Sequence, residues 1–225
     1  MSAHSAPARI TVLISGGGTN LQALLDAANT PSLPDVQFVR VISNRKTAYG
    51  LERATNAGVP TSYHNLVQYK TRFPDPAGGT DFVQARAEYD RELAGKVLAD
   101  KPDIVVCAGW MHILAPTFLD PLGKAGVPVI NLHPALPGAF NGTRAIQRAH
   151  EAFQRGEVKE TGVMVHHVIS EVDMGAPILV REVEIRKGET VEELEERIHQ
   201  VEWKIIVDGT RIAIEQLKSK KNAQS

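Results

Sequence analysis

The chain has 225 residues, of which 43% are hydrophobic and 23% charged, and its formal net charge is −1. These values are ordinary for a globular protein and suit one large α/β domain or two small ones. The balanced charge gives no field that attracts nucleic acid or a membrane surface, and no apolar run is long enough to cross a bilayer. The single cysteine rules out an intrachain disulfide.

Residues 1–8 have no apolar core of the kind that a secretory signal needs. We therefore expect them to be a flexible N-terminus and the protein to be cytoplasmic. The first regular element is a buried strand over residues 9–15, followed by Gly16-Gly17-Gly18-Thr19-Asn20 and then a helix. Such a turn directs backbone N–H groups and a helix dipole at an anion. The alternative is a glycine turn that only joins strand to helix, and the spacing matches neither the dinucleotide fingerprint nor a Walker motif.

Further strands are predicted over residues 36–43 and 59–64, with a helix over 48–57 between them. This βαβαβ pattern is typical of half of a doubly wound sheet. Residues 65–80 are rich in Pro and Gly and predict a loop, and residues 81–99 predict a long helix. Arg86 lies on that helix on the same face as Tyr89 and is most simply a solvated charge.

An apolar strand over 104–108 contains Cys107, which we interpret as a buried structural thiol. The following cluster from Trp110 to Leu114 either forms a wall for a flat ligand or belongs to the core. The run Val129–Pro134 predicts another short buried strand that ends at a proline. Asn131 and His133 share one face of it at its carboxyl end, where open parallel sheets bind ligands. They are a plausible catalytic pair, although a turn-closing Asn and a space-filling His would fit equally well.

The remaining chain predicts a helix over 144–154, strands over 161–169 and 176–185, and a final helix from about Thr190 to Leu217, with a flexible tail over 218–225. His166 and His167 are adjacent, so they face opposite sides of the strand and cannot chelate one metal together. The order of elements indicates an α/β fold, with a single domain built on a mostly parallel, doubly wound (Rossmann-like) sheet and helices on both faces.

Several motifs lie at or near the predicted strand ends, and their order along the chain is informative. They are Ile14-Ser-Gly-Gly-Gly-Thr-Asn, Ser43-Asn44, Arg86-x-x-Tyr-Asp-Arg-Glu, Ala108-Gly-Trp-Met-His-Ile-Leu, Asn131-Leu-His-Pro and Asp173-Met-Gly. In this order they resemble the phosphoribosylglycinamide formyltransferases, folate-dependent enzymes of purine synthesis, from about residue 9 to 217. The chain departs from that family's usual pattern at Gly17, where Asn is frequent, at His112, where Arg is usual, and at Ala135-Leu-Pro-Gly, where Ser-Leu-Leu-Pro is usual.

The resemblance implies a formyltransferase-type domain over 9–217, with a phosphate-binding half (about 9–100) and a folate-binding and catalytic half (about 101–217). It implies transfer of the formyl group of 10-formyltetrahydrofolate to the amine of phosphoribosylglycinamide, without a metal, by a monomer or homodimer. The implied catalytic residues are Asn131, His133 and Asp173. Those implied to hold the second substrate are Gly17, Gly18, Thr19, Asn20 and Glu202. The implied folate-binding residues are Arg86, Trp110, Met111, His112, Ile113, Leu114, Asn131, Val172 and Asp173.

In this interpretation the amine attacks the formyl carbon directly. Asn131 and a protonated His133 would stabilise the oxyanion, and Asp173 would orient the imidazole and favour its charged form. Four alternatives remain: hydrolysis of 10-formyltetrahydrofolate, a transferase acting on methionyl-tRNA, a metallohydrolase with His133, His166 and Asp173 as ligands, and a non-enzymatic module that binds a sugar phosphate. The family members that catalyse the first two of these reactions carry an additional domain, which is amino-terminal in the hydrolase and carboxyl-terminal in the methionyl-tRNA transferase.

Overall fold

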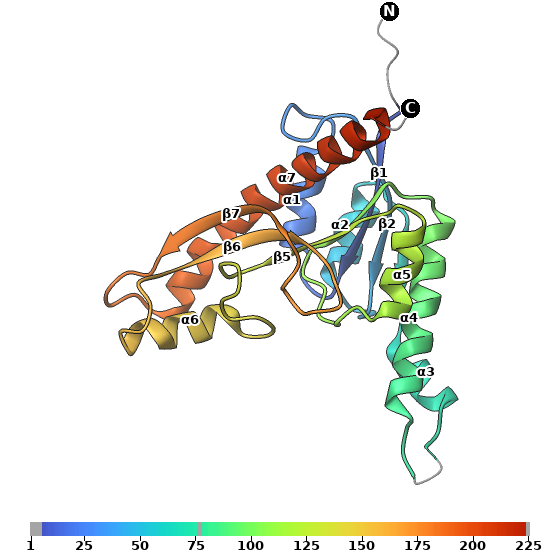
Figure 1. Cartoon of the computed structure of the whole chain (residues 1–225), viewed down its shortest axis with the longest axis horizontal. Helices are drawn as coiled ribbons and strands as arrows, with labels where there is room; N and C mark the ends of the chain where they lie inside the picture. Colours follow the sequence, from blue (N-terminus) through green and yellow to red (C-terminus); the bar gives the residue numbers. More distant parts are fainter. Residues whose placement is uncertain (1–5, 76–77, 224–225) are drawn as a thin grey trace, which may run out of the picture. The chain divides into compact units, whose positions relative to one another are not determined.

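The computed structural model describes residues 6–75 and 78–223 (Figure 1). Seven strands form one sheet in the order β3-β2-β1-β4-β5-β6-β7. The strands are β1 (Ala8–Ile14), β2 (Val36–Ser43), β3 (Thr61–Tyr63), β4 (Ile104–Cys107), β5 (Val129–His133), β6 (Glu160–His167) and β7 (Pro177–Glu184). The helices are α1 (Thr19–Ala27), α2 (Tyr49–Asn56), α3 (Leu66–Arg72), α4 (Phe82–Ala99), α5 (Pro116–Lys124), α6 (Ala145–Gln154) and α7 (Val191–Ala223). This architecture confirms the predicted α/β fold with a mostly parallel sheet.

The chain divides into two compact units. The first contains the chain up to Leu25 and Asp35–Val129, and the second contains Asp26–Pro34 and the chain from Ile130 onward. The functional halves expected from the sequence meet near residue 100, whereas these units divide at Val129. The assignment of separate roles to the two halves stays a prediction.

The first unit is built on parallel strands. β1 pairs with β2 on one side and β4 on the other, and β2 pairs with β3. Six of the seven residues of β1 are buried, as expected for a central strand of a parallel sheet covered on both faces. Cys107, at the end of β4, is also buried, and burial raises the pKa of its thiol to about 12. This confirms its interpretation as a structural thiol.

Two helices of the first unit were not predicted. The stretch 65–80 was expected to be a loop, but it contains α3, which Asn65 caps by accepting a hydrogen bond from the N–H of Val67. Pro and Gly residues occur only from Pro74 onward, so they end the helix rather than prevent it; residues 76–77 of the stretch lie outside the described residues. Helix α5 has Pro116 in its first turn, where the missing N–H costs nothing, and it buries Phe118 and Leu122 one turn apart.

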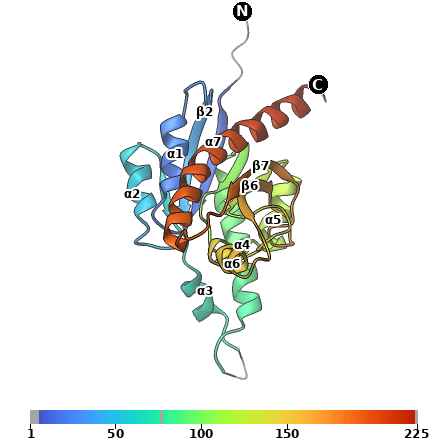
Figure 2. The same cartoon turned by 90° about the vertical axis from the view of Figure 1, so that its left-hand side faces the viewer.

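The second unit joins an antiparallel ribbon to two helices. β5 pairs with β6, and β6 with β7, both antiparallel. Helix α7 packs along β6 and β7, as both views show (Figures 1 and 2). It continues to Ala223, six residues beyond its predicted end at Leu217, so the expected tail is helical as far as it is described; residues 224–225 lie outside the described residues.

At the other end of the chain, β1 begins at Ala8, within the segment expected to be a flexible N-terminus, and residues 1–5 of that segment lie outside the described residues.

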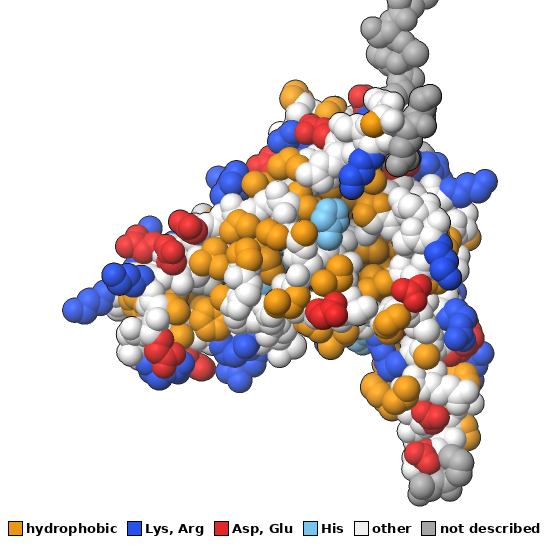
Figure 3. Space-filling view, in the orientation of Figure 1, with side chains coloured by type: hydrophobic (Ala, Val, Ile, Leu, Met, Phe, Trp, Pro, Cys, Tyr) orange, Lys and Arg blue, Asp and Glu red, His pale blue; other side chains and the backbone are white. Residues whose placement is uncertain are grey.

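Lys and Arg side chains are interspersed with Asp and Glu on the face shown in Figure 3. None of the helices in the described ranges is long and apolar enough to cross a bilayer.

Candidate active site

A polar cluster in the second unit surrounds one carboxylate, that of Asp173. Its Oδ2 lies 3.4 Å from Nδ1 of His133 and accepts a hydrogen bond of 2.8 Å from the backbone N–H of Gly142. Its Oδ1 lies 3.5 Å from Nδ2 of Asn131 and 3.5 Å from Nε2 of His166. The structure therefore brings together Asn131, His133 and Asp173, the three residues expected to be catalytic.

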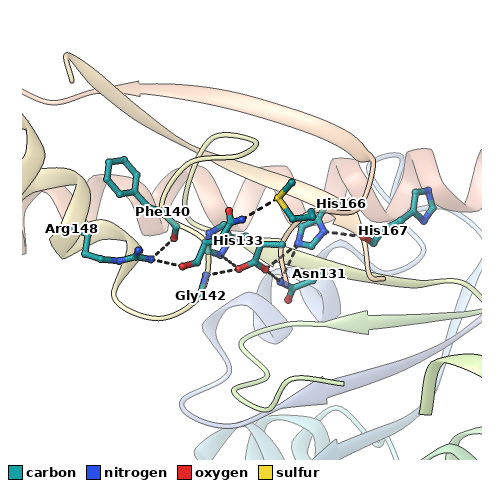
Figure 4. Close-up of polar contacts among 10 residues, drawn as sticks. Asn131, His133, Phe140, Gly142, Arg148, His166 and His167 are labelled. Carbon is teal, nitrogen blue, oxygen red and sulfur yellow. Dashed lines mark hydrogen bonds and ion pairs between the residues drawn. The ribbon is translucent and has the colours of Figure 1, made fainter. Parts of the chain in front are cut away.

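Strand geometry explains how two of these side chains meet. Asn131 and His133 alternate along β5 and so project from the same face. In the antiparallel pairing with β6, Asn131 lies opposite His166, and Nδ2 of Asn131 is 3.3 Å from Nε2 of His166. Figure 4 shows the rings of His133 and His166 on the cluster and the ring of His167 directed away from it, which confirms that the two adjacent histidines face opposite sides.

The turn after β6 holds Asp173 in an unusual backbone conformation. Its φ is +57°, in the left-handed region, which Asp tolerates better than most residues. The neighbouring Val172 and Met174 are exposed, and the sulfur of Met174 accepts a hydrogen bond of 3.1 Å from the amide of Asn141. Val172, expected to touch folate, thus presents an apolar side chain to solvent beside the carboxylate.

The imidazole of His133 is buried and prefers its neutral form. Burial lowers its pKa below the ordinary 6.5 more strongly than the charge of Asp173 raises it, and His166 adds to the lowering. We expected Asp173 to favour the charged form; its effect has that sign, but desolvation outweighs it. The ring nitrogen Nε2 is buried and has no hydrogen-bond partner among the described residues.

The carboxylate of Asp173 remains charged despite its surroundings. Burial alone would raise its pKa, but hydrogen bonds from His166 and from the N–H of Gly142, together with the nearby His133, hold it below the ordinary 3.8. The cluster therefore pairs a charged carboxylate with a neutral imidazole whose second nitrogen, Nε2, has no hydrogen-bond partner among the described residues.

The glycine turn of the first unit lies between β1 and α1, where the sequence predicted an anion site. Gly16, Gly17 and Thr19 are exposed at the start of α1. Gly18 has φ +73°, and a side chain there would come within 2.6 Å of the Cα of Gly50. Only glycine allows this approach of the turn to α2, so packing alone explains why residue 18 is a glycine. Phosphate binding by Gly17–Asn20 stays a prediction.

Arg86 is not the solvated charge that its sequence context suggested. Its guanidinium bonds both carboxylate oxygens of the buried Asp90, donates to the carbonyl of Ile113 at 2.6 Å and lies 3.0 Å from Nδ1 of His112. The Asp90 carboxylate also accepts a weak bond of 3.3 Å from the N–H of Ala115. Arg86 and Asp90 thus fix the conformation of the loop after β4.

That loop is part core and part surface. Trp110 and Leu114 are buried, whereas Met111 and Ile113 are 65% and 64% exposed. Burial, followed by the charge of Arg86, lowers the pKa of His112 to about 4, so its ring is neutral near pH 7. The exposed Met111 and Ile113 offer the apolar surface that a flat ring system needs, and the folate contacts of residues 110–114 and Arg86 stay predictions.

Glu202 is buried on the apolar face of α7, which it shares with Ile198, Ile205 and Ile206. Carboxylates are rarely found in such a position unless they have a specific partner or a function. Its contact with the second substrate stays a prediction.

Sequence reasoning missed three contributors to the cluster. They are His166, which was treated only as a strand residue and an alternative metal ligand, Gly142, whose N–H binds Asp173, and Arg148, whose guanidinium binds the carbonyls of Phe140 and Asn141 in the same loop. The antiparallel register that places His166 opposite Asn131 could not be read before β6 was known to pair with β5. Among the residues that the structure describes, no group of three or more His, Cys, Asp or Glu side chains could hold a metal ion.

An amide, an imidazole and a carboxylate meet at the end of β5 in a mostly parallel α/β sheet, and open sheets of this kind bind ligands at the carboxyl ends of their strands. The chain belongs to the formyl transferase family, whose model matches residues 8–210.

Several similar proteins carry a more specific description. The phosphoribosylglycinamide formyltransferase of Schizosaccharomyces pombe is 52% identical over 203 residues, which cover 90% of this chain and 95% of that protein. The protein of the same name from Saccharomyces cerevisiae is 45% identical, over 93% and 99% of the two chains. The crystal structure of glycinamide ribonucleotide transformylase 1 from Symbiobacterium toebii has a TM-score of 0.78 at 34% identity and covers 96% of this chain and 92% of that one.

Proposed function

We propose that this protein transfers the formyl group of 10-formyltetrahydrofolate to the amine of phosphoribosylglycinamide, as a step of purine biosynthesis. The observation that carries the proposal is the arrangement around His133. A carboxylate lies at its Nδ1, the amide of Asn131 lies on the same strand face, and Nε2 is buried without a partner among the described residues. The names and coverage of the relatives support the same reaction.

The neutral His133 defines how the proton moves. Nδ1 is the ring nitrogen nearest Asp173, so we assign the proton of the neutral ring to Nδ1. The lone pair that accepts a proton then belongs to Nε2, which has no hydrogen-bond partner among the described residues. The amine nitrogen forms a bond to the formyl carbon, and the carbonyl electrons move onto oxygen, giving an oxyanion and a positively charged nitrogen. His133 takes a proton from that nitrogen and returns one to N10 of the folate as the C–N10 bond breaks. Asp173 stabilises the imidazolium that exists between these two transfers.

Asn131 supplies the second contribution, a donor for the oxyanion. Its present contacts from Nδ2, at 3.3 Å to His166 and 3.5 Å to Asp173, are at the long end of the hydrogen-bond range. They are weak enough to be exchanged for a charge-assisted bond to the oxyanion when it forms. The side chains that meet in the cluster are an amide, two imidazoles and a carboxylate, and we propose that they assist a direct transfer.

The substrates require two further kinds of surface. We assign the phosphate to the turn Gly17–Asn20 at the amino end of α1, and the sugar or glycinamide to Glu202. We assign the folate to Arg86, to Met111 and Ile113 with their neighbours in 110–114, and to Val172 next to Asp173. The proposed compartment is the cytoplasm, and the choice between monomer and homodimer stays a prediction.

A spectroscopic assay of the purified protein tests the reaction. Protein, phosphoribosylglycinamide and 10-formyltetrahydrofolate are mixed, and release of tetrahydrofolate is followed. We expect release that depends on both substrates and one formylated product per tetrahydrofolate. Equal release without the amine would indicate hydrolysis instead. No release, combined with tight binding of the sugar phosphate, would indicate a non-enzymatic module, and activity that requires a stoichiometric zinc ion would favour the metallohydrolase alternative.

A further inference from the structure

Arg148 connects helix α6 to the loop that faces the catalytic cluster. Its Nη2 donates to two successive backbone carbonyls, those of Phe140 and Asn141, the latter at 2.6 Å (Figure 4). The guanidinium carbon also lies 5.9 Å from the centre of the Phe140 ring. The side chain is only partly exposed, and its Nε is buried without a hydrogen-bond partner among the described residues. The two hydrogen bonds of this guanidinium therefore both go to the loop that contains Phe140 and Asn141.

The loop needs such a restraint because of its backbone conformation. Phe140 has φ +50°, which is unfavourable for a bulky residue, and Gly142 has φ +83°. A left-handed non-glycine residue costs about 1 kcal/mol or more and persists only where its surroundings hold it. Bonds from a guanidinium to two adjacent carbonyls supply that hold, because they are charge-assisted and fixed in direction.

The next residue of the loop makes the shortest bond to the catalytic carboxylate. The N–H of Gly142 donates to Oδ2 of Asp173 at 2.8 Å, whereas the side-chain contacts of that carboxylate are 3.4 to 3.5 Å long. The position of Asp173 thus depends on where Gly142 lies, and the position of Gly142 depends on the two carbonyls before it.

We propose that Arg148 is a positioning residue for formyl transfer: by binding the carbonyls of Phe140 and Asn141 it holds the Gly142 N–H on Asp173 and so keeps the carboxylate at Nδ1 of His133. This inference rests on the proposed function, since it assigns Arg148 to the same site. Arg148 contributes no group to the reacting atoms.

The charges around the cluster agree with this role. Burial has the largest effect on the pKa of His133 and lowers it. Among the surrounding groups, Asp173 and a hydrogen bond to the backbone of Phe140 raise that pKa, and His166 and Arg148 lower it. The groups that act on Asp173 are His166, Gly142 and His133. Loss of Arg148 releases the Gly142 N–H from Asp173, and a carboxylate without that bond titrates at a higher pH.

The test compares Arg148→Met and Arg148→Lys with Arg155→Met. Arg155 follows the last residue of the same helix, and its side chain pairs with the exposed Glu157. Its replacement therefore removes an equal charge from the region of α6 without touching the loop. We expect Arg148→Met to lower kcat about 10- to 100-fold with KM for both substrates within about threefold. Arg148→Lys recovers part of the loss because an ammonium can bind one carbonyl, and Arg155→Met matches the wild type.

A second measurement does not depend on activity. Carboxyl carbon chemical shifts, followed by NMR against pH, give the pKa of Asp173 in each folded variant. We expect it to rise toward the ordinary 3.8 in Arg148→Met and to be unchanged in Arg155→Met. An unchanged Asp173 titration in Arg148→Met, or a kcat loss equal to that of Arg155→Met, overturns the inference. If the wild type does not transfer a formyl group, the proposed function fails and the titration alone decides the role of Arg148. If Arg148→Met does not fold, the same two comparisons are made on Arg148→Lys.

Discussion

Replacement of Asp173 by Asn tests the central assignment of the site. The side chain is nearly isosteric, so its oxygen still accepts from the N–H of Gly142. The charge next to His133 is lost, however, and with it the stabilisation of the imidazolium. At 3.4 Å and an effective dielectric constant of about 20, two unit charges attract by about 5 kcal/mol. Because about 1.4 kcal/mol corresponds to a factor of ten, and solvent entering the site recovers part of the loss, we expect kcat to fall about 1,000-fold.

The assay is the release of tetrahydrofolate at saturating concentrations of both substrates, with affinity for a folate analogue measured separately by calorimetry. Folate affinity is expected to stay within about threefold of the wild type, because the loss concerns a charge that develops only during the reaction. A turnover within tenfold of the wild type, in a variant shown by circular dichroism to be folded, refutes the role of the carboxylate.

Three other predictions address different parts of the molecule. Asn131→Ala is expected to lower kcat about 100- to 1,000-fold, because an oxyanion donor is lost, and steady-state kinetics would show whether KM stays near its original value. Gly18→Ala forces a Cβ to within 2.6 Å of the Cα of Gly50, so we expect weaker binding of a sugar phosphate in calorimetry and a lower melting temperature. The lowered pKa values of His112 and His133 predict that the free energy of unfolding falls as the pH drops below 6.5, because these rings bind protons in the unfolded chain but not in the native protein. Urea unfolding at pH 7 and pH 5 measures this difference. Equal stability at the two pH values contradicts the prediction.

The elements that sequence alone predicted best are those with a clear period and clear ends. β5 is a short apolar run between a Gly-Pro turn and Pro134, and its alternation placed Asn131 and His133 on one face. α4 was predicted to within one residue at its start. α5 was missed because prolines at 116 and 121 obscured the buried pair Phe118 and Leu122.

Only part of the candidate site could be predicted from local sequence patterns. The pair on β5 follows from local pattern, but Asp173 lies 40 residues beyond His133 and entered through a family resemblance rather than through spacing. His166 and Arg148 were missed for a related reason. The role of His166 depends on the antiparallel register of β5 and β6, and that of Arg148 depends on two backbone carbonyls. Neither feature can be read from the types of the side chains in the sequence.

The distances in the cluster indicate which part of it is fixed before substrate binds. The bond from Gly142 to Asp173 is 2.8 Å long, whereas His133, His166 and Asn131 approach the same carboxylate only to 3.4–3.5 Å. A buried neutral imidazole gains little from a closer approach, but an imidazolium gains several kcal/mol at an effective dielectric constant of about 20. The carboxylate is therefore held by backbone while the side chains around it remain free to shorten their contacts as charge develops. An arrangement of this kind stabilises the charged intermediate more than the resting state, and that difference is what accelerates a reaction.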